Sequence, residues 1–142
     1  MDITIRQAEV CDIPHLLEMN EKFNGAGATA ASMKESLENS MGEIVLVAIT
    51  NDVVVGFICG QLYKSICYAD GFLAELTELY VREEYRRKGV AAKLVSALEV
   101  KFLENNAHEI IVKTGDDNEE AHGLYLRCGY EDYEETVFSK EI

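Results

Sequence analysis

The chain has 142 residues, of which 48% are hydrophobic and 27% are charged, with one proline and ten glycines. This length predicts one domain whose core is large enough to fold without a disulfide or a metal. The composition excludes the disordered and collagen-like classes. Acidic side chains outnumber basic ones by 26 to 13, so the formal net charge is −13 at pH 7. That charge argues against binding to nucleic acid or to an anionic membrane surface, and it either attracts cations or serves solubility alone.

The sequence shows no targeting signal and no metal-binding motif. Its apolar stretches are far shorter than the roughly 20 residues of a membrane span, and its first residues resemble a strand, so we expect a cytoplasmic protein. Four cysteines are present: Cys11, Cys59, Cys67 and Cys128. They form no C-x-x-C pair and have no histidine at zinc-ligand spacing, so we expect reduced thiols and no bound metal. Cys128 stays open as a nucleophile, although no local motif supports that role.

Hydrophobic periodicity predicts ten elements in the order β-α-α-β-β-β-α-β-α-β. The expected strands are residues 3–7, 43–50, 53–63, 72–82, 108–114 and 130–140. The expected helices are residues 12–24, 28–41, 90–105 and 118–128. We therefore predict an α/β fold, with a central mixed sheet of about six to seven strands flanked by helices.

Connections between these elements define the sheet further. Asn51-Asp52 joins two apolar, β-branched runs and predicts an antiparallel hairpin. The strand, helix and strand that follow residue 72 predict a parallel pair with a right-handed crossover. Neither a repeat nor a linker interrupts the chain, so we expect a single domain over residues 1–142.

A basic segment interrupts the otherwise acidic chain. Five of its 13 basic residues lie within twelve positions, from Arg82 to Lys93, between a predicted strand and a long helix. The first N–H groups of a helix have no partner within the helix, and the positive end of the helix dipole is directed at the same place. Gly89 and the small residues after it allow a ligand to approach the backbone closely. The segment is therefore a candidate anion site, with a solvated basic turn as the alternative.

Two motifs in the second half of the chain resemble those of a known family. Arg86-x-x-Gly89-x-Ala91, after the strand residues Glu78-Leu79-Tyr80-Val81, is similar to the acetyl-CoA signature Q/R-x-x-G-x-G/A of GNAT N-acetyltransferases. Asn118-x-x-Ala121-x-x-x-Tyr125-x-x-x-Gly129-Tyr130 resembles the family's next motif. The order of strands and helices fits as well, so the resemblance covers the whole chain.

The resemblance implies a site for acetyl-CoA as co-substrate. The pyrophosphate would bind the backbone amides of the basic turn, and the pantetheine arm would run along the strand before it. A backbone N–H near Tyr80 would hold the thioester oxygen, and Asn118 would bind the arm from the far side. The implied cofactor-binding residues are Leu79, Tyr80, Val81, Arg86, Arg87, Lys88, Gly89, Val90, Ala91, Ala92, Asn118 and Tyr125.

The same resemblance implies the catalytic groups. Tyr125 would protonate the departing thiolate, with packing of its helix as the alternative role. Glu75 and Glu78 are both candidates for the base that takes a proton from the substrate ammonium. Simple alternation places them on opposite faces of their strand, and a β-bulge would change that. We prefer Glu78 and keep Glu75 as the alternative.

The predicted function is transfer of acetyl to a primary amine of a small cationic acceptor. The small size, the acidity and the run Gly115-Asp116-Asp117 resemble aminoglycoside 3-N-acetyltransferases, and polyamine acetyltransferases are nearly as similar. Protein N-terminal or lysine acetylation and a non-catalytic acyl-CoA sensor remain alternatives. Loops 24–33 and 64–73 would form the acceptor site, and the acidic runs 116–120 and 131–135 either line it or are solvated. Family members often dimerise, so a homodimer is one of the expected oligomeric states.

Overall fold

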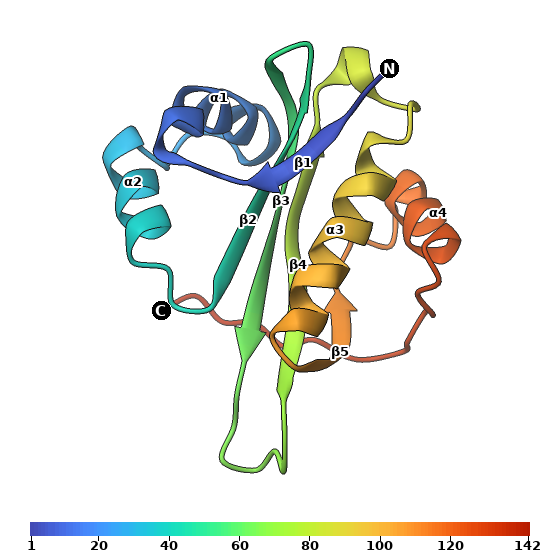
Figure 1. Cartoon of the computed structure of the whole chain (residues 1–142). Helices are drawn as coiled ribbons and strands as arrows, with labels where there is room; N and C mark the ends of the chain where they lie inside the picture. The colour runs from blue at the N-terminus through green and yellow to red at the C-terminus, as the bar shows by residue number, and fades with distance from the viewer.

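The computed structural model describes residues 1–142, which form one five-stranded sheet with helices on both faces (Figure 1). The elements in chain order are β1 (Thr4–Gln7), α1 (Ile13–Asn24), α2 (Ala30–Glu38), β2 (Glu43–Thr50), β3 (Val53–Tyr63), β4 (Phe72–Val81), α3 (Val90–Glu104), β5 (Ala107–Val112) and α4 (Glu119–Arg127). Two short 3₁₀ turns, Val10–Asp12 and Glu83–Tyr85, precede α1 and α3. None of the helices combines the length and apolar composition of a membrane crossing.

The strands follow the order β1-β2-β3-β4-β5 across the sheet. The predicted hairpin between β2 and β3 is confirmed, and both residues of its turn, Asn51 and Asp52, have positive φ angles, of 50° and 61°. Such angles characterise the two-residue turn whose twist matches that of the flanking strands. The predicted parallel pair is also confirmed, since β5 returns beside β4 after the α3 crossover.

Two separate apolar layers hold the helices to the sheet. On one face, Leu94, Leu98 and Phe102 of α3 pack on the β2, β3 and β4 side chains and are almost fully buried. Gly60 of β3 permits this close approach, because an added Cβ there would meet the Phe102 ring. On the other face, α1 contributes Leu16 and Met19 to a smaller cluster, and α2 packs beside α1. The sheet is therefore covered on both sides in its centre.

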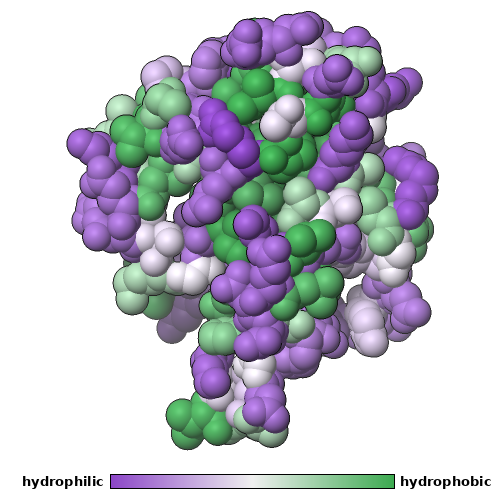
Figure 2. Space-filling view, viewed as in Figure 1, coloured by the Kyte–Doolittle hydropathy of each residue, from purple (hydrophilic) through white to green (hydrophobic).

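The β3–β4 hairpin extends beyond the helices at one end of the molecule (Figure 1). Figure 2 shows that hydrophilic side chains cover much of the visible face and that a hydrophobic group lies at the tip of this hairpin. Ile66, in the loop between the two strands, is fully exposed there.

The predicted final strand over residues 130–140 is wrong, and so is the predicted count of six to seven strands. Residues 131–142 have no regular secondary structure and are exposed. Four acidic residues in the run 131–135 leave no alternating apolar face for the sheet to bury. Val137 and Phe138, the most strand-like residues, remain 66% and 91% exposed. Pairing without burial of one face gives a strand too little stabilisation to form.

The second helix is shorter than the prediction of 28–41. It begins at Ala30, because Thr29 is its N-cap: the Thr29 hydroxyl accepts from the Ser32 amide, and the Ser32 hydroxyl accepts from the Thr29 amide. It ends at Glu38, several residues before Gly42. The remaining elements agree with the predicted boundaries to within one or two residues.

Candidate active site

The carboxyl half of β4 has an unpaired edge. β5 pairs with β4 from Phe72 to Leu76 only, whereas β3 accompanies β4 as far as Val81. From Thr77 to Val81, one side of β4 therefore presents backbone amides and carbonyls without a strand partner. A free edge of this kind can pair with an extended ligand that carries amide groups. β4 and β5 therefore part after Leu76.

The chain turns sharply between this edge and α3, and the turn has left-handed backbone at two places. Arg87 has φ 60° and Gly89 has φ 82°, and Gly89 is the N-cap of α3. No side chain caps this helix, and the amides of residues 87–92 donate to no acceptor within the protein. Such consecutive amides at the positive end of a helix dipole suit an anion. The turn that the sequence singled out therefore has the geometry of a phosphate site.

The basic side chains of this turn do different things. Arg86 donates from Nε to the Val81 carbonyl at 2.8 Å, and its guanidinium lies 5.3 Å from the centre of the Tyr80 ring. Arg86 thus fastens the turn to the end of β4. Lys88 lies over the Tyr85 ring at 5.9 Å, and Arg87 is exposed with no partner. Arg87 and Lys88 are the cations free to meet a ligand.

A β-bulge brings Glu75 and Glu78 to the same face of the sheet. Glu78 lies opposite Cys59 and Leu76 lies opposite Gly60, so Thr77 is the extra residue on β4. One additional residue between positions 75 and 78 reverses the alternation. Both carboxylates consequently lie on the face covered by α1 and α2. The expectation of opposite faces from simple alternation is wrong, and the bulge is the reason.

The partners of the two carboxylates distinguish them. Glu75 accepts a hydrogen bond from the Tyr63 hydroxyl at 3.0 Å, and its other oxygen lies 3.9 Å from Nζ of Lys113. Glu78 has one partner, Asn24 of α1, which donates from Nδ2 at 3.2 Å. Glu78 therefore has more of its oxygen lone pairs free to accept hydrogen bonds from a substrate ammonium.

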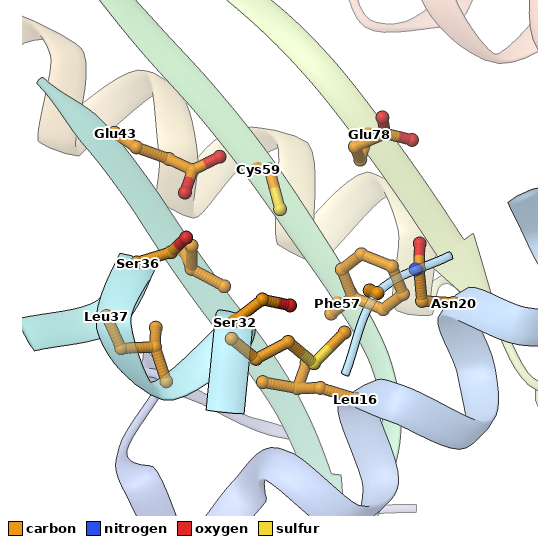
Figure 3. A pocket seen from close by; sticks show the side chains of 12 residues that line it. Leu16, Asn20, Ser32, Ser36, Leu37, Glu43, Phe57, Cys59 and Glu78 are labelled. Atoms are coloured by element: carbon orange, nitrogen blue, oxygen red, sulfur yellow. The ribbon is translucent and has the colours of Figure 1, made fainter. Parts of the chain in front are cut away.

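Glu78 also lines a cavity of about 230 Å³ between α1, α2 and the sheet (Figure 3). Its lining residues are Leu16, Asn20, Ala28, Ser32, Met33, Ser36, Leu37, Glu43, Val45, Phe57, Cys59 and Glu78. The predicted acceptor loop 24–33 thus contributes Ala28, Ser32 and Met33 to the lining. Loop 64–73 and both acidic runs contribute no lining residue.

Glu43 is a site residue that the sequence analysis did not identify. It is half-buried at the start of β2, and burial, followed by the charge of Glu78, raises the pKa of its carboxyl. The Cys59 thiol lies between these carboxylates (Figure 3), and burial, followed by the charges of Glu43 and Glu78, raises its pKa. The available signal was the strand pattern, because Glu43 precedes Val45 and Val47 on one face of β2. An acid that continues an apolar face is a candidate for a cavity.

Tyr125 lies on the other face, where α4 packs beside α3 (Figure 1). It is 8% exposed, and its ring lies 5.8 Å from that of Tyr130 in an edge-on arrangement. Burial, followed by the nearby Cys128, raises the pKa of its hydroxyl to about 12. That hydroxyl is protonated near neutral pH, and it makes no hydrogen bond within the protein. Tyr125 packs its helix on the core and still has a proton to donate.

Asn118 is the N-cap of α4, where its side chain accepts from the Ala121 amide at 3.1 Å. This local role explains why an asparagine precedes the helix. Its contact with a cofactor remains a prediction. The structure contains no group of three or more His, Cys, Asp or Glu side chains that could hold a metal ion.

Comparisons with known proteins identify the family of the chain. The sequence model of the Acetyltransferase (GNAT) family matches residues 13–130. An uncharacterized N-acetyltransferase of Chlorobaculum tepidum is 30% identical over 99% of this chain and 83% of its own length. An acetyltransferase of Yersinia pseudotuberculosis is 28% identical over 70% of this chain and 66% of its own length.

Solved structures share the fold at low sequence identity. An aminoglycoside acetyltransferase from an uncultured soil metagenomic sample, crystallised with sisomicin, has a TM-score of 0.85 at 19% identity. The similarity covers 99% of this chain and 95% of that one. AAC(6')-Iy, crystallised with a CoA bisubstrate analogue, has a TM-score of 0.86 at 18% identity over 100% of this chain and 99% of its own.

Proposed function

The chain belongs to the Acetyltransferase (GNAT) family and is an N-acetyltransferase, and from this premise we propose that it moves the acetyl group of acetyl-CoA to a primary amine of a small cationic acceptor. One observation carries the proposal. Glu78 belongs to the half of β4 with the free edge, and it also lines the cavity beneath α1 and α2. A thioester held along that edge and an amine held in that cavity would meet at Glu78.

The co-substrate fits the residues at the end of β4. The diphosphate of CoA would accept hydrogen bonds from the free amides of residues 87–92, with Arg87 and Lys88 neutralising its charge. The pantetheine amides would pair with the open edge of Leu79, Tyr80 and Val81. The same fold in AAC(6')-Iy has been crystallised with CoA, which supports this assignment.

The transfer itself requires a base and an acid. Glu78, directly or through a water, would take a proton from the substrate ammonium, and the amine nitrogen would then attack the thioester carbon. A backbone N–H near Tyr80 would donate to the oxygen as it gains charge. When the carbon–sulfur bond breaks, Tyr125 would give its proton to the thiolate. The second proton that the nitrogen loses as the amide forms would pass to the Tyr125 phenolate, directly or through water, and restore the neutral hydroxyl. All three partners are held in one ternary complex, so no acetyl-enzyme forms.

The acceptor class follows from the charge of the cavity. Glu43 and Glu78 supply two carboxylates, and no lysine or arginine lines the cavity. Sisomicin, bound to the similar soil enzyme, is an example of a polycationic amine. Aminoglycosides and polyamines are therefore the first acceptors to test, followed by short peptides as candidates for protein acetylation.

A thiol-release assay with acetyl-CoA and a panel of amines tests the proposal. We expect CoA release that depends on a polycationic amine and that weakens with added salt, because screening shortens the attraction of the cavity. CoA release with peptides alone would point to protein acetylation. Binding of acetyl-CoA without release for any amine would point to an acyl-CoA sensor. Sedimentation would establish whether the enzyme is a homodimer.

A further inference from the structure

Glu43 supplies a second carboxylate that the transfer chemistry does not use. It is the first residue of β2, where it pairs with Gln61 of β3, while Glu78 of β4 pairs with Cys59. With strands about 4.8 Å apart and a rise of about 3.4 Å per residue, the two glutamate Cα atoms are separated by about 12 Å. Because strand side chains stand roughly perpendicular to the sheet, the two carboxylates can keep this separation, which leaves room between them for a short molecule with a cation at each end.

The surface between the carboxylates suits an alkyl chain. Cys59 lies between them with its thiol directed into the cavity (Figure 3), and Val45 and Phe57 lie beside it. Cys59 is only 9% exposed, and its thiol has no hydrogen-bond partner. A buried, unpartnered thiol among apolar groups offers contact to methylene groups and gives no ion to pair with a charge. Glu43 and Glu78 thus lie on either side of Cys59 along the sheet, while Ser32 and Ser36 line the cavity from α2 (Figure 3).

The charge of Glu43 is not neutralised within the protein. No lysine, arginine or histidine lies within ion-pair distance of its carboxylate, since none of the six salt bridges of the protein includes Glu43. The proximity of Glu78 further disfavours the negative charge of Glu43. A half-buried carboxylate facing a like charge is costly unless a cation joins it. A ligand with an ammonium group would remove that cost.

We propose that Glu43 determines specificity by binding a second ammonium group of the acceptor, so that diamines with a short alkyl chain are preferred to monoamines. This inference rests on the proposed function, in which Glu78 receives the amine to be acetylated. The amine at Glu78 gives up a proton and attacks the thioester. The amine at Glu43 keeps its proton and holds the chain in place.

The test compares putrescine with n-butylamine, which has the same carbon chain and one amine. In the parent enzyme we expect kcat/KM to favour putrescine by roughly ten- to hundredfold, the range for a hydrogen bond to a charged group. Glu43→Gln should bring this preference close to one. Glu35→Gln is the matched control, since Glu35 is exposed on α2 and does not line the cavity. It removes the same charge and should retain the preference of the parent.

Two further measurements make the result decisive. Glu43→Asp withdraws the carboxylate by one methylene, so it should shift the preference from putrescine toward the longer cadaverine. Calorimetry of putrescine binding, without acetyl-CoA, should show weaker binding to Glu43→Gln than to the parent.

An equal diamine preference in the parent and in Glu43→Gln would overturn the inference while leaving the proposed function intact. Failure of every amine to be acetylated would refute the proposed function. Calorimetry would then decide the inference alone, with equal putrescine binding to the two proteins refuting it.

Discussion

Gly60→Ala should destabilise the protein strongly, because the centre of β3 has no space for a Cβ. The added atom would lie 2.9 Å from Cε1 of Phe102, closer still to Cζ, and 3.1 Å from Cδ1 of Leu98. Phe102 is 0% exposed and Leu98 is 1% exposed, so neither side chain can swing into solvent. Overpacking of this kind costs about 1–3 kcal/mol, and we expect the upper part of that range. For a domain of this size the melting temperature should fall by roughly 6–10 °C.

Thermal and urea unfolding would measure the loss, with Gly25→Ala as the control. Gly25 ends α1 with φ 81°, and a Cβ there would have no atom within 4 Å, so only backbone strain is added. With ψ −173° its backbone lies in a region that is essentially restricted to glycine, so this control should cost about 1–3 kcal/mol through strain alone, and Phe102→Leu should not relieve that cost. In the Gly60→Ala background, Phe102→Leu should cost less than it does in the parent, because the smaller side chain relieves the clash. A melting temperature of Gly60→Ala within a degree or two of the parent would refute the packing argument.

Three further predictions address the site. Arg87→Glu should weaken CoA binding by about tenfold in calorimetry at low salt, and by less at high salt, where the charge is screened. The fold should stay intact, because Arg87 is exposed and makes no contact within the protein. Equal CoA affinity in the variant and the parent would show that the phosphates do not bind at this turn. Tyr125→Phe should lower turnover by about 10²–10⁴-fold with little change in acetyl-CoA affinity. The raised pKa of Tyr125 also stabilises the neutral form, so stability present below pH 10 is lost as the pH rises to about 12. The parent should therefore lose up to about 3 kcal/mol more than Tyr125→Phe over that window in alkaline unfolding. Glu78→Gln should slow turnover most near neutral pH, where the amine is mostly protonated, and it should slow turnover more than Glu75→Gln does; the reverse ranking would make Glu75 the base.

Local patterns predicted most of the fold because each depends on a short segment. The hairpin at Asn51-Asp52 and the crossover from β4 to β5 follow from turn residues and from apolar periods of two and 3.6. The predicted strand over 130–140 is absent because strand formation needs a partner edge and a buried face, and Val137 and Phe138 stay exposed. Neither requirement is visible in the segment itself.

The candidate site divides in the same way. The turn at Arg86 to Ala91 could be predicted, since the phosphate geometry arises from consecutive residues before a helix. The presence of Glu43 and Glu78 in one cavity could not be predicted, because it depends on the register of three strands and on one bulge. Tyr125 was identified by its motif, whereas its burial depends on the packing of α4 against α3.

The bulge at Thr77 lies where β5 stops pairing with β4, directly after Leu76. A bulge bends its strand and increases the local twist, so it helps to part the carboxyl half of β4 from β5. Deleting Thr77 would leave Glu75 two positions before Glu78 in a regular strand, so both carboxylates would keep their face of the sheet. The deletion would instead remove the bend, and with it the shape of the free edge along which an extended ligand would pair.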